Sequence, residues 1–173
     1  IQIRAIEALA LLGAAEAVPD IAAAIDDEFG QDLTDAGFKA LARLGTPGVE
    51  TLVGYLADGD ERQRRRVAAI LAGLTGSLAE EATSRALRDP ARNVRVAAAR
   101  ALAARDPEDT RLLALFRDSS PAIRAFALEN IGPRFPEWIE RLLGDRSHLV
   151  QRAILDLLAA KHGLLPRDAV LDW

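Results

Sequence analysis

The sequence contains no cysteine and no methionine, and it has only two histidines. Without cysteine there is no disulfide bond, no thiolate metal ligand and no cysteine nucleophile. His148 and His162 stand far apart without an acidic third ligand at helical spacing, so we expect no metal site and no cofactor. Ser147 beside His148 is not a catalytic pair, because consecutive helical residues point about 100° apart. We therefore expect no catalytic residues.

Long apolar runs are also missing. The longest runs, such as residues 8–12, fall far short of the roughly 20 residues that a membrane helix requires. No basic segment followed by an apolar stretch opens the chain. We therefore expect a cytoplasmic protein without membrane association. The first residues already read as the interior of an amphipathic helix, so we also expect further sequence before Ile1.

One apolar pattern recurs along the 173 residues. Six nine-residue segments carry small or apolar residues at their fifth and sixth places and Leu or Ile at the ninth. This is the stripe of a helix that buries one face. The ninth places are residues 9, 41, 71, 102, 131 and 157, so the spacings are 32, 30, 31, 29 and 26 residues. A period near 30 predicts a repeat protein built from stacked helices.

A second set of helices is expected between these segments, over residues 16–27, 47–58, 77–88, 107–117 and 135–143. A side-chain acceptor followed by proline marks the predicted start at Thr46-Pro47, Asp106-Pro107 and Ser120-Pro121. Ser77 with Glu80 predicts a capping box. No segment has the pattern of a strand, so the predicted fold class is all-α.

The clearest copies of the repeat are residues 89–102 and 118–131, in which an aspartate is followed by Val-Arg or Ile-Arg and then by an alanine-rich run. This pattern resembles the short HEAT-like repeats of the phycobilisome-lyase type. The resemblance runs along nearly the whole chain, and Val150 stands at the arginine position of the last repeat. It implies a right-handed α-solenoid of about five HEAT-like helix pairs with extra end helices, forming a single domain over residues 1–173.

The resemblance also implies a ladder of charged groups that ties repeat to repeat. Its groups stand six residues apart, in Asp58 with Arg64, Asp89 with Arg95 and Asp118 with Arg124. An arginine–carboxylate pair is short and directional, so we expect this ladder to be structural. The apolar core should contain the ninth-place residues, and we predict nearly complete burial of Leu41, Leu71, Leu102, Ile131 and Leu157.

Charge is uneven along a chain whose net charge is −4. Residues 1–60 carry three basic and eleven acidic groups, whereas residues 61–105 carry ten arginines and four acidic groups. On the helix that buries Leu71, three arginines are expected to face solvent, and two more face away from the core in the next repeat. We predict a partner-binding surface, called the basic patch, formed by Arg62, Arg65, Arg66, Arg92, Val96 and Arg100.

These features predict a noncatalytic scaffold that binds another protein, one with an acidic surface. The exposed positions of the other helices are chemically mixed, whereas a nonspecific nucleic-acid groove repeats its positive charge at every step. Two alternatives stay open. One is a lyase-like subunit acting on a tetrapyrrole-carrying protein, which the family resemblance implies. The other is anion or nucleic-acid binding through the basic patch, and the arginines are also compatible with a merely solvated helix face.

Overall fold

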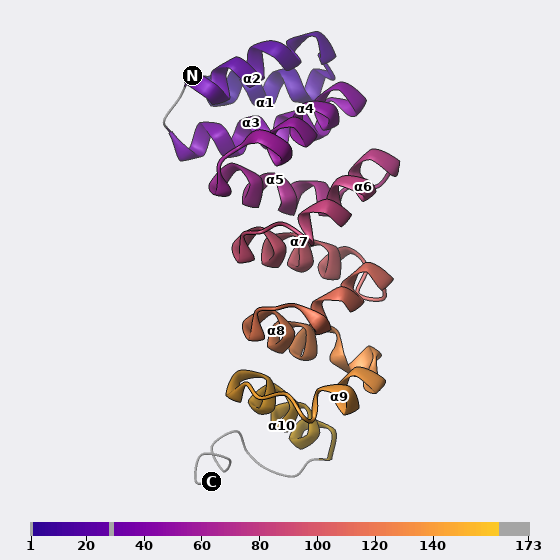
Figure 1. Cartoon of the computed structure of the whole chain (residues 1–173). Coiled ribbons are helices and arrows are strands. Elements are labelled where there is room, and N and C mark those ends of the chain that lie inside the picture. Colours follow the sequence, from indigo (N-terminus) through magenta and orange to yellow (C-terminus); the bar gives the residue numbers. More distant parts are fainter. Residues whose placement is uncertain (1, 28–29, 163–173) are drawn as a thin grey trace. The chain divides into compact units, whose positions relative to one another are not determined.

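The structure is a computed structural model that describes residues 2–27 and 30–162. Within these ranges every regular element is a helix, which confirms the all-α class (Figure 1). No helix of the described part is long and apolar enough to cross a membrane. The chain divides into two compact units, residues 1–105 (unit 1) and 106–173 (unit 2). The single solenoid over the whole chain stays a prediction, and Ile1 lies outside the described residues.

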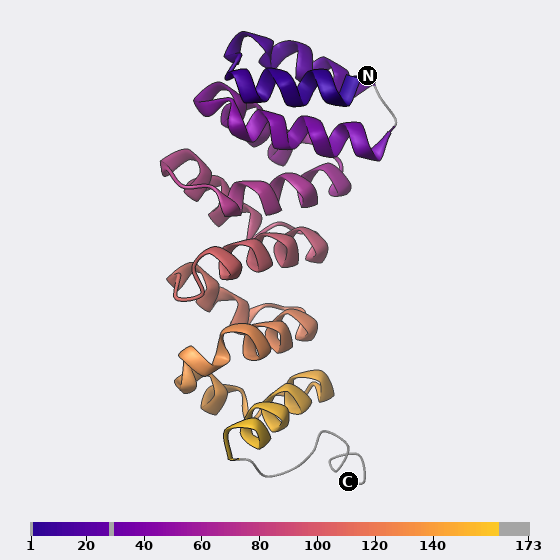
Figure 2. The same ribbon diagram turned by 180° about the vertical axis from the view of Figure 1, so that it is seen from behind.

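Unit 1 consists of two rows of helices (Figures 1 and 2). The first row contains α1 (Gln2–Leu12), α3 (Gln31–Arg43), α5 (Glu61–Gly73) and α7 (Arg92–Arg105), and each helix packs against the next one in the row. The second row contains the 3₁₀ turn η1 (Ala15–Ala17) with α2 (Val18–Asp27), then α4 (Gly45–Asp58) and α6 (Ser77–Ala86). Helices of the second row pack on their sequence neighbours in the first.

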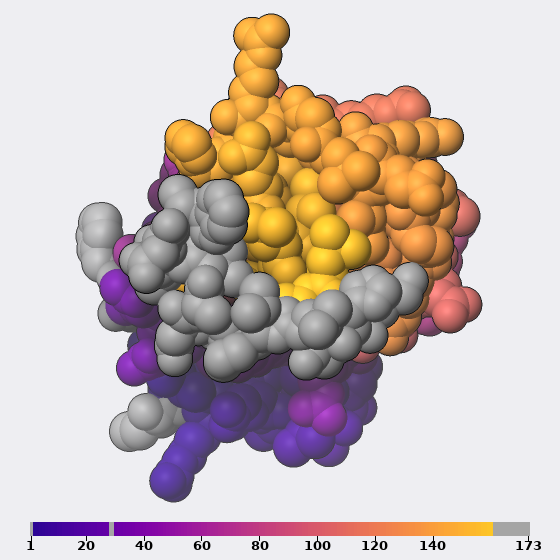
Figure 3. All heavy atoms as spheres, turned by 90° about the horizontal axis from the view of Figure 1, so that it is seen from below, coloured from indigo at the N-terminus to yellow at the C-terminus, as the bar shows by residue number. Residues whose placement is uncertain are grey.

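Unit 2 continues the alternation with shorter elements. These are the 3₁₀ helix η2 (Thr110–Arg117), α8 (Pro121–Ile131), the turn η3 (Gly132–Arg134), α9 (Pro136–Leu142) and α10 (His148–His162). The helix α8 packs against η2 and α10, and α10 also contacts α9. Figure 3 shows α10 in yellow beside the orange segment that carries α9.

The helices lie close to their predicted positions, but several predicted caps are wrong. The helix expected from residue 107 is a 3₁₀ helix that begins at Thr110, because the carboxylate of Asp109 accepts the backbone N–H of Arg111 at 2.9 Å. The Asp106 carboxylate instead accepts the N–H of Glu108 at 3.1 Å, inside a turn.

At the other predicted starts, either the helix begins before the expected N-cap residue or the expected N-cap side chain makes no hydrogen bond. The helix α4 begins at Gly45, so Thr46 lies inside its first turn. Ser77 is the first residue of α6, so the N-cap is Gly76 and not Ser77 as predicted. Ser120 is the N-cap of α8 but makes no capping hydrogen bond. A capping box does form at α5, where Asp60 and Gln63 exchange hydrogen bonds of 2.7 and 3.0 Å.

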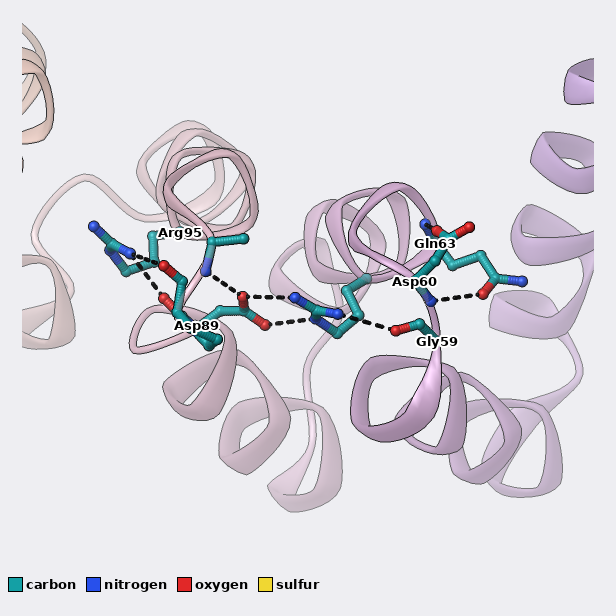
Figure 4. Close-up of polar contacts among 8 residues, drawn as sticks. Gly59, Asp60, Gln63, Asp89 and Arg95 are labelled. Carbon is teal, nitrogen blue, oxygen red and sulfur yellow. Dashed lines mark hydrogen bonds and ion pairs between the residues drawn. The ribbon is translucent and has the colours of Figure 1, made fainter.

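Arginine and aspartate connect successive turns of the chain. Arg64 donates to both oxygens of the Asp89 carboxylate, with Nε–Oδ2 at 2.9 Å and Nη2–Oδ1 at 3.2 Å, and to the carbonyl of Gly59 at 3.0 Å (Figure 4). In unit 2, Arg124 donates in the same way to Asp145 at 2.7 and 2.9 Å. Each of these aspartates also accepts the backbone N–H two residues further on. We call such a pair an Arg–Asp joint.

The six-residue step of the sequence encodes a second kind of contact, between an arginine and a main-chain carbonyl. Arg95 donates to the main-chain carbonyl of Asp89 at 2.8 Å (Figure 4). In unit 2, Arg124 donates to the main-chain carbonyl of Asp118 at 2.7 Å. The Asp89 carboxylate faces the arginine of the preceding repeat instead. Arg64 likewise bonds the carbonyl of Gly59, the residue after Asp58, and its guanidinium reaches forward to the Asp89 carboxylate.

Four of the five residues predicted to lie in the core are buried, and the exception belongs to the last repeat. Leu41, Leu71, Leu102 and Ile131 are fully or almost fully buried. Leu157 is only half-buried. Gln151 donates to the carbonyl of Asp145 at 2.9 Å and so takes the arginine position of this repeat. The contact to the turn is therefore one residue later than predicted, whereas Ala153 and Ile154 are buried at their predicted fifth and sixth places and Val150 is buried as well.

Candidate functional site

An open groove of about 610 Å³ lies between α5 and α7 in unit 1. It brings together four of the six predicted basic-patch residues: Arg65, Arg66, Val96 and Arg100. The other lining residues are Ala69, Asn93, Ala97 and Ala101. We call this site the α5/α7 groove. The remaining two patch residues, Arg62 and Arg92, are exposed on the first turns of the same helices and do not line it.

The repeat places the groove residues at defined levels. Leu71 and Leu102 are both fully buried and stand 31 residues apart, as do Arg64 and Arg95, which both donate to carbonyls of the preceding turn. Residues 31 apart therefore lie side by side on α5 and α7, so Arg65 is level with Val96 and Ala69 is level with Arg100. Four helical residues rise about 6 Å. The two arginines thus stand on opposite walls, one turn apart.

The floor of the groove is apolar and made of small side chains. Ala69, Ala97 and Ala101 are half-buried there, together with Val96. Beneath them, the two helices are packed through fully buried alanines, which are Ala68, Ala72, Ala98 and Ala99. Small residues let two helices approach closely. The floor of the groove therefore consists of small apolar side chains between the arginines.

The expectation that Arg66 faces solvent is wrong. Its Nε lies 3.0 Å from the carboxylate of Asp35, its Nη2 donates to the Gln31 side chain at 3.4 Å, and only 16% of its side chain is exposed. The reason is that α3 packs beside α5 and carries this acid on the facing side. A signal for the contact exists in the sequence, because Asp35 occupies in α3 the place that Arg65 occupies in α5.

A second polar contact, missed by sequence reasoning, lies at the start of the groove. The side-chain amide of Asn93 on α7 donates to the carboxylate of Glu61 on α5 at 2.8 Å. It joins the first turns of the two helices, which shows that they run in the same direction. It also places one negative charge at this end of the groove.

A separate hollow of about 470 Å³ lies beside α2 and α4 and includes Tyr55 and Asp26. The Tyr55 hydroxyl lies 2.8 Å from an Asp26 carboxylate oxygen and 3.2 Å from the carbonyl of Ala22, and its ring packs edge-on against Phe38. Burial, and then the hydrogen bond to Asp26, raise the pKa of the Tyr55 phenol. These contacts tie α2 to α4, and no sequence pattern had singled them out.

Neither a metal site nor a match to a known protein gives further information about the α5/α7 groove. In the part of the chain that the structure describes, no three His, Cys, Asp or Glu residues are grouped so that they could hold a metal ion. The side chain of His162 lies outside that description. No protein-family model and no curated protein sequence matches the chain. The chemistry of the α5/α7 groove is therefore the basis for a functional proposal.

Proposed function

We propose that this protein is a HEAT-like, right-handed α-solenoid that acts as a noncatalytic scaffold and binds another protein through the α5/α7 groove. The two rows of helices in unit 1 and the Arg–Asp joints in both units support this architecture. Short helical repeats need such contacts between successive repeats, because each repeat is stabilised mainly by its neighbours. The repeats resemble those of the phycobilisome-lyase type.

The single observation that carries the function is the composition of the groove. It combines arginines on both walls with an apolar floor. An exposed ion pair contributes only about 0 to 1 kcal/mol, so arginines alone would hold a partner weakly. Protein interfaces are typically apolar at the centre and polar at the rim, and arginine is enriched in them. The groove has this arrangement.

A protein partner is favoured over a nucleic acid because the positive charge does not continue along the row of helices. Arg66 is neutralised from α3 by Asp35, and Glu61 lies at the start of the groove. A nucleic-acid backbone gains affinity from many successive phosphate contacts. Two arginines bounded by carboxylates suit a short acidic segment of a protein better.

Site-specific photocrosslinking tests the proposal. A photoreactive amino acid replaces Ala97 in the groove, and a control chain carries it at Ala57, an exposed alanine of α4. In cells that make this protein, we expect a protein adduct from position 97 and none from position 57. The adduct should survive nuclease treatment and disappear when Arg65→Glu and Arg100→Glu are added, while circular dichroism stays unchanged.

Other outcomes would contradict the proposal in distinct ways. The absence of any protein adduct at position 97 would remove the groove as a binding surface. An adduct that nuclease destroys would favour the nucleic-acid alternative. An adduct partner that carries a tetrapyrrole and is modified by this protein would favour the lyase-like alternative.

A further inference from the structure

Unit 2 carries a pair of arginines that share one aromatic ring. Arg117, the last residue of η2, and Arg141 of α9 both lie over the ring of Trp138, with their central guanidinium carbons 4.9 and 4.8 Å from the ring centroid. We propose that these three residues, called the Arg–Trp clamp, form a binding site for a phosphate monoester. The clamp is separate from the α5/α7 groove, and its function does not depend on the proposed scaffold function.

Aromatic packing inside unit 2 fixes the ring on which the two arginines lie. Phe116 stacks on the indole of Trp138 with a centroid distance of 5.2 Å and an angle of 6° between the rings, and Phe135 packs edge-on against Phe116 at 6.5 Å. Only 8% of Trp138 is exposed, whereas Arg117 and Arg141 are both exposed. The indole is therefore a rigid support that holds two charged groups at the surface.

The hydrogen-bond donors of both guanidinium groups are available to a ligand. A guanidinium over an aromatic ring is attracted by the charge distribution of the ring, so its N–H donors are not used up by an acceptor. Within the part of the chain that the structure describes, neither Arg117 nor Arg141 makes a hydrogen bond or an ion pair. Glu137 stands four residues before Arg141, at the spacing of an ion pair within a helix, yet Arg141 contacts Trp138 instead.

Two unpaired positive charges held close together favour a doubly charged anion. The two centroid distances place the guanidinium carbons of Arg117 and Arg141 no more than about 10 Å apart. Like charges at such a distance repel each other, and an anion between them reverses the sign of the interaction. A phosphate that accepts hydrogen bonds of about 2.8 Å from two guanidinium groups holds their central carbons about 8 Å apart. Small rotations of the two exposed side chains are enough to reach this spacing.

Among common biological anions, a phosphate monoester matches the clamp best. It has three free oxygens and a charge of about −1.5 to −2 at neutral pH, so it can accept from both arginines at once. A carboxylate carries one charge and two oxygens, both of which a single bidentate arginine engages. A phosphodiester, as in a nucleic-acid backbone, also carries only one charge.

Titrations of the full chain followed by nuclear magnetic resonance test the proposal. The probes are inorganic phosphate and a capped glycine–phosphoserine–glycine tripeptide. We expect the Nε–H signals of Arg117 and Arg141 and the indole N–H signal of Trp138 to shift with one common dissociation constant. The Nε–H signals of Arg146 and Arg152, two exposed arginines of unit 2, should not follow this curve. The same tripeptide with aspartate in place of phosphoserine, and dimethyl phosphate, should bind at least about fivefold more weakly.

Variants show whether the clamp itself binds the probe. R117Q and R141Q each leave one guanidinium and should weaken binding of the phosphoserine tripeptide about tenfold or more. The matched control is R146Q/R152Q, which removes two exposed charges of the same unit outside the clamp and should alter affinity by no more than about twofold. Circular dichroism should be the same for all variants, because every substituted side chain is exposed.

Three results would overturn the inference: no saturable shift at the two clamp arginines, equal affinity for the aspartate tripeptide or for dimethyl phosphate, or an equal loss of affinity in R146Q/R152Q. Tighter binding of the phosphoserine tripeptide than of inorganic phosphate would support the clamp and identify a phosphorylated protein as the source of the monoester. Equal binding of both would support recognition of the phosphate group alone. None of these results changes the crosslink expected at position 97, so the two proposals fail separately.

Discussion

Replacing Gly48 with alanine tests the close packing of α3 against α4. Gly48 is buried in the first part of α4, and a Cβ at this position would lie 2.0 Å from the backbone oxygen of Leu41 in α3. Real Cβ atoms essentially never come closer than 3.0 Å to such an atom. The two helices would have to separate by about 1 Å, since a main-chain carbonyl cannot rotate away as a side chain does.

The expected magnitude follows from two opposing effects. Overpacking a well-packed site costs about 1 to 3 kcal/mol, and replacing a helical glycine with alanine returns up to about 1 kcal/mol. Because the obstacle is backbone, we expect a net loss of about 2 kcal/mol. Gly54 in the same helix is the matched control, because it is exposed and a Cβ there would meet nothing within 4 Å. Gly54→Ala should therefore stabilise the protein by about 0.5 to 1 kcal/mol.

Urea titration followed by far-ultraviolet circular dichroism measures both variants, and hydrogen exchange of α3 and α4 peptides locates the change. Both tryptophans, Trp138 and Trp173, belong to unit 2, so tryptophan fluorescence serves as an internal control for the unit that carries no substitution. If Gly48→Ala is as stable as the unchanged protein while Gly54→Ala behaves as expected, the close approach of α3 and α4 is refuted.

Three further predictions concern the core and the two polar clusters. Leu102→Ala should cost about 2 to 5 kcal/mol in urea titration, because Leu102 is fully buried, and a loss below 1 kcal/mol would contradict its place in the core. The hydrogen bond from Arg124 lowers the pKa of Asp145, so this carboxylate stabilises the folded state above the ordinary aspartate pKa of about 3.9. That contribution is lost as the pH falls through the lowered value, and the urea midpoint of the unit 2 fluorescence should depend less on acid pH in Asp145→Asn; an unchanged pH dependence would contradict the joint. Tyr55 is the only tyrosine and its pKa is raised, so near-ultraviolet absorbance should show no phenolate near pH 10 while unit 1 is folded, whereas an ordinary titration curve would refute its contact with Asp26.

The helix positions could be predicted because they depend on apolar spacing, which a sequence displays directly. Leu41, Leu71 and Leu102 recur at nearly constant steps, and all three are buried. Helix starts depend on backbone angles that the pattern does not reveal. Ser77 has the right neighbours for a capping box, but Gly76, at φ 109°, takes the N-cap position before it. In the last repeat the contact to the turn was expected one residue too early, because Gln151 stands where α5, α7 and α8 have arginine.

The sequence could predict the candidate site only for side chains whose position follows from the buried stripe of α5 or of the next repeat helix, α7. Arg65, Val96 and Arg100 line one groove because the outward side of each helix follows from its buried stripe. The pairing of Arg66 with Asp35 depends on how α3 packs against α5, and that arrangement is not contained in the pattern of either helix alone. Contacts between helices far apart in sequence are the part that sequence reasoning missed.

The Arg–Asp joints have a consequence for how the length of such a chain can change. Each joint uses one guanidinium, one carboxylate and main-chain atoms of the turn, and its geometry is nearly the same at Arg64 with Asp89 and at Arg124 with Asp145. The arginine comes from the first turn of a helix in both cases, and the aspartate comes from a later turn of the chain. One full repeat, from the aspartate of one turn to the residue before the aspartate of the next turn, therefore carries one aspartate and one arginine. Duplication or loss of such a segment leaves every connector with a partner, so we expect repeat number to change more readily than the turn sequences themselves.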